Sequence, residues 1–297
     1  MTVLVTGANG LVGSCVVGRL DAAGEKVVAV GRGRRRELPS RVEYVELDLA
    51  RPDGLRELIA STAPRGVIHC AAMTDVDACE REPAQAWSVN VGATEAAALG
   101  CREAGARLVA LSTDYVFDGE GGPYSEDDAP QPRGVYARTK YVAEQAALLL
   151  APDCAVARVA VVYSGRRGAK RTFASVAAEQ LAAGREVRAF HDQVVSPTLA
   201  DNAAQMVIGV LRSGERGIWH CAGASIVSRV EFCRALARKL RVEERLVIPV
   251  AMASAKLAGP RPARSALVVE KIRGLLGRAV PLELDAALDR FLAERAA

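Results

Sequence analysis

The sequence predicts an α/β fold: a Rossmann-type, doubly wound parallel sheet with a smaller C-terminal lobe. Two observations carry this prediction. The chain opens on a short apolar run at residues 2–6, which is followed at once by a glycine-rich turn and a helical stretch. Further apolar, β-branched runs then alternate with helical periodicities, as in βαβ units. With 297 residues, half of them hydrophobic, the chain is long enough for one large domain and an added lobe.

The first predicted strand, residues 2–6, leads through the turn Gly7-Ala8-Asn9-Gly10-Leu11-Val12-Gly13 into a helix that continues to residue 23. Glycines allow a tight turn and a close approach of backbone to a pyrophosphate, which the N–H groups of the helix N-terminus can hold. The Gly-x-x-Gly-x-x-Gly spacing therefore predicts a dinucleotide site, and it resembles the short-chain dehydrogenase/reductase superfamily in its extended form. The turn residues expected to bind the cofactor are Gly7, Asn9, Gly10, Leu11, Val12 and Gly13.

The second predicted strand, residues 26–30, ends without the acidic residue that would bond the 2′-hydroxyl of NAD. Arg32 and residues 34–36 supply guanidinium groups there instead. We therefore expect a preference for NADP(H), with NAD(H) as the alternative. Arg32 is the first choice for the contact to the 2′-phosphate, and a solvent-facing arginine cluster is the other interpretation.

The third predicted strand, residues 42–46, leads into Asp48 and Leu49. In the extended reductases that the turn resembles, an Asp followed by an apolar residue lies along the adenine. Asp48 and Leu49 are therefore cofactor candidates, with a turn-forming Asp as the alternative. A helix is then predicted from Pro52 to Thr62, because Pro suits the first helical position.

The fourth strand and its exit are predicted at residues 66–72, where the small side chains of Ala71 and Ala72 leave room for the cofactor to cross the strand ends. A long helix is predicted over residues 84–104. It carries Asn90, which the superfamily resemblance implies is a structural residue near the active site.

A pair of side chains on a later helix has the spacing of an acid/base site. The fifth predicted strand, residues 107–113, brings Thr113 to the carboxyl end of the sheet, where such sheets bind ligands. The helix predicted over residues 136–150 then places Tyr136 and Lys140 at i and i+4 on one face. A nearby ammonium lowers the pKa of a phenol from its ordinary value of about 10. Tyr136 is therefore a candidate general acid or base activated by Lys140, and a solvated helix face is the alternative.

The second half of the chain alternates more loosely. We divide the chain into an NADP(H)-binding Rossmann domain at residues 1–160 and a substrate-binding lobe at residues 161–297, which is interleaved with late elements of the first domain. Strands are predicted at residues 155–162, 187–190 and 217–221, and helices at 175–183, 199–212, 228–240 and 282–296.

Several motifs are more specific than the superfamily pattern. They are Ala71-Ala72-Met73-Thr74-Asp75-Val76-Asp77-Ala78-Cys79-Glu80, Ser112-Thr113-Asp114-Tyr115-Val116-Phe117-Asp118-Gly119, Tyr136-Ala137-Arg138-Thr139-Lys140, Asp192-Gln193-Val194-Val195-Ser196-Pro197-Thr198, Ser228-Arg229-Val230-Glu231-Phe232 and Arg261-Pro262-Ala263-Arg264-Ser265. Together they resemble the dTDP-4-dehydrorhamnose reductase family over nearly the whole chain.

The resemblance implies NADPH-dependent reduction of a 4-keto nucleotide sugar, with dTDP-4-dehydrorhamnose as the first expectation and dTDP-rhamnose as its product. In that reading Tyr136 donates the proton, Lys140 lowers its pKa and bonds the nicotinamide ribose, and Thr113 bonds the carbonyl oxygen. Cations are needed for the substrate's pyrophosphate. The expected substrate contacts are Thr74, Asp75, Val76, Asp114, Lys170, Arg171 and Arg264.

The chain departs from the family pattern at a few positions. Ala137 and Ala143 stand where the family has glycines. Val195 replaces the Gly before Ser-Pro-Thr, and Arg171 stands where the family tends to have a small residue or Asn. The last two positions lie in segments expected to contact the substrate, so they leave the identity of the sugar open.

Three other functions remain open at this point. A nucleotide-sugar epimerase or dehydratase shares the fold and the Tyr/Lys pair but keeps its cofactor tightly bound. A non-catalytic NADP-binding regulatory subunit would resemble the methionine adenosyltransferase β subunit. The third is a reductase that acts on some other ketone.

Composition narrows the classes of partner. The net charge of +4 comes from 39 basic and 35 acidic residues, a balance that does not indicate nucleic acid. Seven cysteines without a Cys-x-x-Cys pair or a Cys/His cluster predict neither a disulfide framework nor a metal site, and they fit a reducing cytoplasm. No leader peptide or membrane span is expected. A homodimer is a further expectation.

Overall fold

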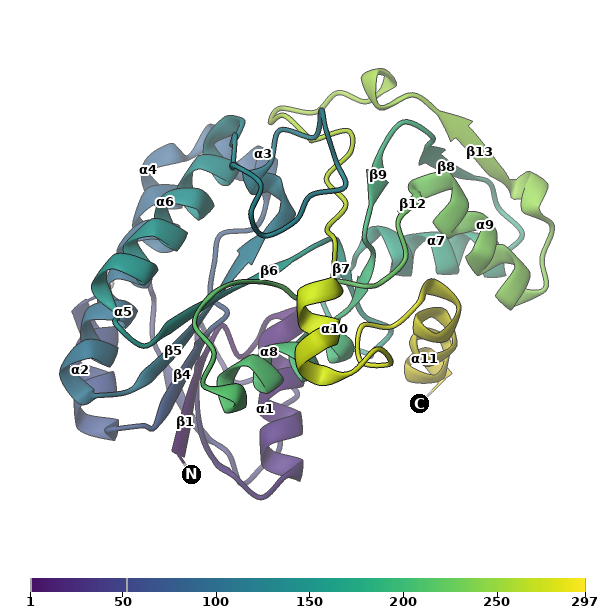
Figure 1. Ribbon diagram of the computed structural model, residues 1–297. Helices are drawn as coiled ribbons and strands as arrows, with labels where there is room; N and C mark the ends of the chain where they lie inside the picture. The colour runs from purple at the N-terminus through teal and green to yellow at the C-terminus, as the bar shows by residue number, and fades with distance from the viewer. Residues whose placement is uncertain (1, 52, 297) are drawn as a thin grey trace.

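The computed structural model describes residues 2–51 and 53–296. Within them, seven strands form a central sheet in the order β11-β6-β5-β4-β1-β2-β3, and every pairing in it is parallel (Figure 1). The order reverses between β1 and β4, the kind of switch point at which such sheets bind ligands. This topology confirms the predicted doubly wound fold. The strands are β1 (Thr2–Thr6), β2 (Lys26–Gly31), β3 (Glu43–Glu46), β4 (Gly66–His69), β5 (Arg107–Thr113), β6 (Cys154–Val159) and β11 (Gly217–His220).

Helices cover both faces of this sheet (Figure 1). In β1, Val3 and Val5 point to one face and Leu4 to the other, and all three are fully buried. Because strand side chains alternate, the apolar run supplies two separate cores. One core lies under α1 (Leu11–Ala22), α8 (Ala200–Ser213) and α10 (Glu270–Leu276), and the other under α2 (Asp53–Thr62), α5 (Ala93–Ala104) and α6 (Gly134–Leu150).

A second, smaller lobe lies on the right in Figure 1. Its core packs the Tyr163 ring edge-on against Phe232 and Phe291, with ring centroids 5.3 and 5.4 Å apart. Such aromatic contacts stabilise a small core beyond the area that they bury. The elements around it are α7 (Phe173–Ala182), α9 (Arg229–Leu240), α11 (Leu284–Ala296), η3 (Glu244–Leu246), η4 (Met252–Ser254) and the strand pairs β7 (Val162–Tyr163) with β10 (Thr198–Leu199), β8 (Val187–Phe190) with β13 (Val247–Val250) and β9 (Val194–Val195) with β12 (Val227–Ser228).

Elements from the second half of the chain return to the central sheet. Helix α8 packs on α1, where Arg19 and Asp201 form an ion pair of 2.6 Å, and β11 pairs with β6. Strand β11 covers the outer edge of β6, and these returns tie the two lobes together at several points along the chain.

Two predicted elements differ from the observed ones. The strand predicted at residues 155–162 ends at Val159, because Val161 has a φ of 43° and a left-handed residue cannot continue a strand. The helix predicted at residues 84–104 is divided into α4 (Pro83–Trp87), a π-turn over Ser88–Gly92 and α5. A π-turn often marks a functional site, and this one contains Asn90.

Several short elements have no counterpart in the sequence prediction. They are too short for a hydrophobic period to be recognised. Pro52, predicted to open the second helix, lies outside the described residues. The additional elements include α3 (Val76–Arg81), α10, β13 and the single turn η2 (Asp114–Val116).

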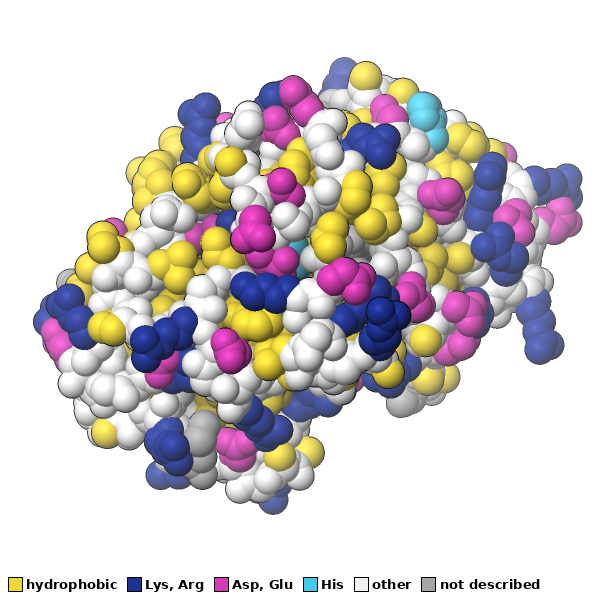
Figure 2. Space-filling model, in the orientation of Figure 1, with side chains coloured by type: hydrophobic (Ala, Val, Ile, Leu, Met, Phe, Trp, Pro, Cys, Tyr) yellow, Lys and Arg dark blue, Asp and Glu magenta, His cyan; other side chains and the backbone are white. Residues whose placement is uncertain are grey.

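Acidic and basic side chains are mixed over the face shown in Figure 2. In the described part of the chain, no helix combines the length and the apolar character that crossing a bilayer would demand.

Candidate active site

Tyr136 and Lys140 lie in the first two turns of α6 and are both buried, 9% and 4% exposed. The helix begins at Gly134, whose φ of 78° turns the chain into it. The Glu80 carboxylate of α3 accepts a hydrogen bond of 2.7 Å from the Val135 N–H, and so caps the helix start. Residues from two different helices therefore fix where the phenol lies.

The buried face of α6 continues one turn beyond Lys140. The Lys140 ammonium donates to the Leu111 carbonyl oxygen at 2.8 Å. Burial lowers the pKa of Lys140 to about 8, and the Glu144 carboxylate opposes this shift. Glu144 accepts two hydrogen bonds, of 2.9 and 2.8 Å, from the fully buried Arg158 of β6. Sequence reasoning missed this pair, although the spacing of Tyr136, Lys140 and Glu144 at i, i+4 and i+8 could have indicated the third residue.

The pKa of Tyr136 differs from the expectation. Burial raises it above the ordinary value for a phenol, while a hydrogen bond with Thr113 opposes the shift and the Asp114 charge adds to it. The expected lowering by Lys140 is therefore wrong for this structure. The ammonium donates to a backbone carbonyl instead, and desolvation of the buried phenol is the largest influence on its pKa. Tyr136 consequently holds its proton at neutral pH.

Thr113 ends β5 and contacts three neighbours. Its hydroxyl accepts from the Tyr115 N–H at 3.3 Å and donates to Asp114 Oδ1 at 3.2 Å, and it opposes the rise in the pKa of Tyr136. The hydroxyl of Ser265 donates to Asp114 Oδ2 at 2.5 Å. Both oxygens of Asp114, a predicted substrate contact, are therefore engaged by the protein itself.

Asn90 joins the loop after β4 to α6. Its amide oxygen accepts from the Met73 N–H at 2.7 Å, and its amide nitrogen donates to the Thr139 hydroxyl at 2.9 Å. Asn90 is fully buried, so the π-turn that aims it inward has a positioning function at this site.

The glycine-rich turn is as compact as its sequence predicts. At Gly7, with a φ of 66°, a Cβ would lie 2.7 Å from the Ala71 nitrogen, and at Gly13 a Cβ would lie 2.2 Å from the Gly7 oxygen. No side chain caps α1, and no acidic residue lies in its first turn. The backbone N–H groups there fit the diphosphate of a dinucleotide. Val12 and Leu49 are buried in the cores on the two faces of the sheet.

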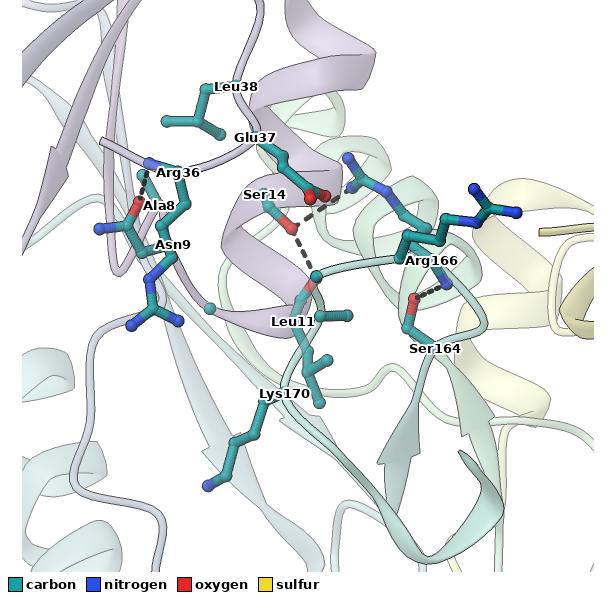
Figure 3. Close-up of a pocket in the computed structure, with 14 residues that line it drawn as sticks. Ala8, Asn9, Leu11, Ser14, Arg36, Glu37, Leu38, Ser164, Arg166 and Lys170 are labelled. Carbon is teal, nitrogen blue, oxygen red and sulfur yellow. Dashed lines mark hydrogen bonds between the residues drawn. The ribbon is translucent and has the colours of Figure 1, made fainter. Parts of the chain in front are cut away.

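A pocket of about 280 Å³ adjoins this turn (Figure 3). Arg36 lines it on one side of Leu11 and Arg166 on the other. Arg32 is exposed and does not line it, although the sequence favoured Arg32. Asn9 explains the difference, because its side chain binds the carbonyls of Arg32 and Arg34 and the N–H of Arg36 and so fixes the loop.

Asp48 forms a local turn, and its contact with the cofactor stays a prediction. Its carboxylate accepts from the Ala50 N–H at 3.0 Å in a local turn, and its side chain is exposed. Ala71 and Ala72 are partly buried at the exit of β4, beside the glycine turn.

The basic loop at residues 164–171 closes over the pocket. Arg166 donates to the Ser14 hydroxyl at 3.4 Å, directly above α1. Lys170 donates to the Thr74 hydroxyl at 3.4 Å, which joins two predicted substrate contacts from opposite halves of the chain. The sequence predicted that Thr74 and Lys170 each contact the substrate, but only the fold brings the two side chains together.

The other predicted substrate contacts are spread more widely. Asp75 caps α3 by accepting from the Ala78 N–H at 2.9 Å, and Val76 packs in the apolar cluster that contains Tyr136. Arg171 pairs with Glu179 at 2.6 Å on the surface, and Arg264 is exposed. Arg171 and Lys170 line the same second pocket, whereas Arg264 does not line it.

Three polar side chains, those of Tyr115, Gln193 and Arg229, form a wall beside Tyr136 that connects the two lobes. The Tyr115 ring packs edge-on against Tyr136, with centroids 5.7 Å apart, and the side chain of Gln193 acts on the pKa of Tyr115. Arg229 donates to the Gln193 side chain at 2.9 Å, and its guanidinium lies 4.0 Å from the centre of the Phe173 ring. Sequence reasoning missed this wall, because nothing local links these positions.

Comparisons with known proteins agree with this geometry. A family model described as RmlD substrate binding domain matches residues 1–296. A dTDP-4-dehydrorhamnose reductase from Mycobacterium tuberculosis is 35% identical over 89% of this chain and 84% of its own length. A probable low-salt glycan biosynthesis reductase from Haloferax volcanii is 36% identical over 97% of this chain and 96% of its own. A Bacillus anthracis dTDP-4-dehydrorhamnose reductase, solved in complex with NADP, superposes with a TM-score of 0.85 at 25% identity over 99% of both chains.

Proposed function

The chain belongs to the RmlD substrate binding domain family and is an NAD(P)-dependent oxidoreductase, and from that premise we propose that it reduces a 4-keto nucleotide sugar with NADPH. The first candidate substrate is dTDP-4-dehydrorhamnose, with dTDP-rhamnose as the product. One observation carries the proposal. Thr113, Tyr136 and Lys140 are all buried where α6 packs on the carboxyl end of β5.

The cofactor is NADP(H), and NAD(H) is the alternative that related enzymes use. We assign its site to residues 1–160, where the uncapped start of α1 holds the diphosphate and Ala71 and Ala72 leave room at the strand ends. Bound NADPH supplies the hydride for the keto carbon.

The protein's own residues supply the proton. We assign Tyr136 as the general acid, because a phenol kept protonated by burial can donate to the oxygen that becomes the alkoxide. Thr113 donates a hydrogen bond to the same oxygen. We assign the Lys140 ammonium, on the same helix face, to the nicotinamide ribose, which is the role that the family resemblance implies.

We assign the sugar nucleotide to the lobe at residues 161–297 and to the loop after β4. Thr74 and Lys170 lie within hydrogen-bond distance of each other, which supports placing both at the substrate. Lys170 then offers its charge to the pyrophosphate. A homodimer and a cytoplasmic location remain predictions from the sequence.

An assay of NADPH oxidation over a panel of 4-keto nucleotide sugars tests the proposed function. We expect turnover with dTDP-4-dehydrorhamnose and release of NADP(H) on dialysis. Retention of the nucleotide with interconversion of sugar epimers would favour an epimerase instead. NADPH binding without turnover on any member of the panel would favour the regulatory-subunit alternative.

We propose that Arg36, which lines the pocket, contacts the 2′-phosphate in place of Arg32. Replacing Arg36 with Ala is expected to raise the Kd for NADPH about tenfold, in line with the loss of one charge-assisted hydrogen bond, and to leave the Kd for NADH nearly unchanged. Titration of the intrinsic fluorescence with each nucleotide measures both constants. Arg32→Ala is the matched control from the same loop. A larger NADPH defect in the control than in the Arg36 variant would return the assignment to Arg32.

A further inference from the structure

Asp114 is a buried carboxyl that the proposed reaction does not yet use. It lies next to Thr113 in the chain and is 1% exposed. Its oxygens face two hydroxyl groups, those of Thr113 and Ser265, at 3.2 and 2.5 Å. A carboxyl in this position has a direct effect on where the Thr113 proton points.

The Thr113 hydroxyl has one proton and more than one acceptor in reach. It can accept two hydrogen bonds but donate only one. The Tyr115 N–H occupies one acceptor position at 3.3 Å. Asp114 Oδ1 and a reacting carbonyl oxygen therefore compete for the single proton, which can serve only one of them at a time.

The charge state of Asp114 decides this competition. An ionised carboxylate only accepts, so it draws the Thr113 proton to Oδ1. Because Oδ2 accepts the Ser265 proton, a proton bound to Asp114 lies on Oδ1. The neutral carboxyl then donates to the Thr113 oxygen, which frees the Thr113 proton for the phenol or the substrate. The neutral form of Asp114 holds one more proton than the ionised form, and this proton comes from solvent.

We propose that Asp114 is a positioning residue whose neutral form turns the Thr113 hydroxyl toward the reacting carbonyl, and whose ionised form turns it away. The inference rests on the proposed function, since it assigns Thr113 as a donor to that carbonyl.

The surroundings of Asp114 place this change in an accessible pH range. Three charged or titratable groups interact electrostatically with Asp114. They are Arg229 of α9, which acts on the pKa of Asp114, and Tyr115 of η2 and Tyr136 of α6, whose pKa values Asp114 raises. Burial raises the pKa of Asp114 to about 6, while the hydrogen bonds from Ser265 and Thr113 and the charge of Arg229 oppose the shift. The Nε of Arg229 donates to Gln193, so its charge favours the carboxylate only from a distance.

The test compares pH profiles of kcat/KM, which report groups of the free enzyme. For the natural protein we expect kcat/KM to fall by at least about tenfold as pH rises from 5.5 to 8, because an oxyanion donor is withdrawn. In Asp114→Asn, the amide N–H can face Thr113 and the amide oxygen Ser265, as in the neutral acid. This variant is expected to lose the fall and to exceed the natural protein at pH 8 by a similar factor.

Ser265→Ala provides a second variant with a predicted direction. Removing a donor to the carboxylate raises the pKa of Asp114, so the fall in kcat/KM should move to higher pH. A purely structural role for Asp114 would not move the profile in this way. A fall that persists unchanged in Asp114→Asn, or a fall that stays in place in Ser265→Ala, would overturn the inference.

Carbon-13 NMR of aspartate carboxyls gives a readout that needs no substrate. We expect one carboxyl to titrate near pH 6, to vanish in Asp114→Asn and to titrate higher in Ser265→Ala. Absence of that titration overturns the inference alone. Absence of turnover on the whole sugar panel, with the titration present, overturns the proposed function instead.

Discussion

Replacing Tyr136 with Phe is expected to lower turnover by at least about 10²-fold, the range for loss of a general acid. The variant removes one oxygen from a ring that is 9% exposed and packed edge-on against Tyr115, so the fold has no reason to change. NADPH affinity should stay within a few-fold, because the glycine turn and the start of α1 are untouched. Stopped-flow NADPH oxidation, together with a separate binding titration, measures the two effects.

Tyr141→Phe is the matched control, since Tyr141 follows Lys140 in the same helix and packs against a core rather than against Thr113. We expect it to retain normal turnover. Equal rates in Tyr136→Phe and the natural protein would remove Tyr136 from the proposed mechanism. An equal loss in both variants would point to a distorted α6 instead.

Replacing Arg158 with Met is expected to lower the free energy of unfolding by about 3–5 kcal/mol, the cost of leaving a buried charge without its partner. Arg158 and Glu144 are both nearly inaccessible to solvent and form two hydrogen bonds. The guanidinium also lies 5.0 Å from the centre of the Phe117 ring. Urea unfolding followed by circular dichroism measures the loss.

The double variant Glu144→Leu with Arg158→Met distinguishes the cost of leaving one buried charge unpaired from the cost of losing the ion pair itself. When both charges are replaced by apolar groups of similar size, most of the stability should return, because neither residue then leaves an unpaired charge. A double variant less stable than Arg158→Met would show that the apolar side chains do not fit this site. A single variant as stable as the natural protein would contradict the premise that the pair is buried.

The sheet and its glycine-rich turn were predictable because their signals are local. A strand, a glycine-rich turn and a helix occupy residues 2–23 without interruption, and the buried run of β1 needs no distant partner to be recognised. The i and i+4 spacing of Tyr136 and Lys140 is likewise a property of one helix. Such local patterns can be recognised in the sequence without knowing how the rest of the chain folds.

The sequence by itself determined the doubly wound fold, the glycine turn and the face of α6 on which Tyr136 and Lys140 lie. The tertiary structure alone decided that Arg36 lines the pocket in place of Arg32, that Lys140 bonds a backbone carbonyl, and that Asp114 meets Ser265 from 151 positions away. The physical reason is that burial and long-range hydrogen bonds set the pKa of a side chain and the direction in which it points. Neither is encoded in the residues next to it along the chain.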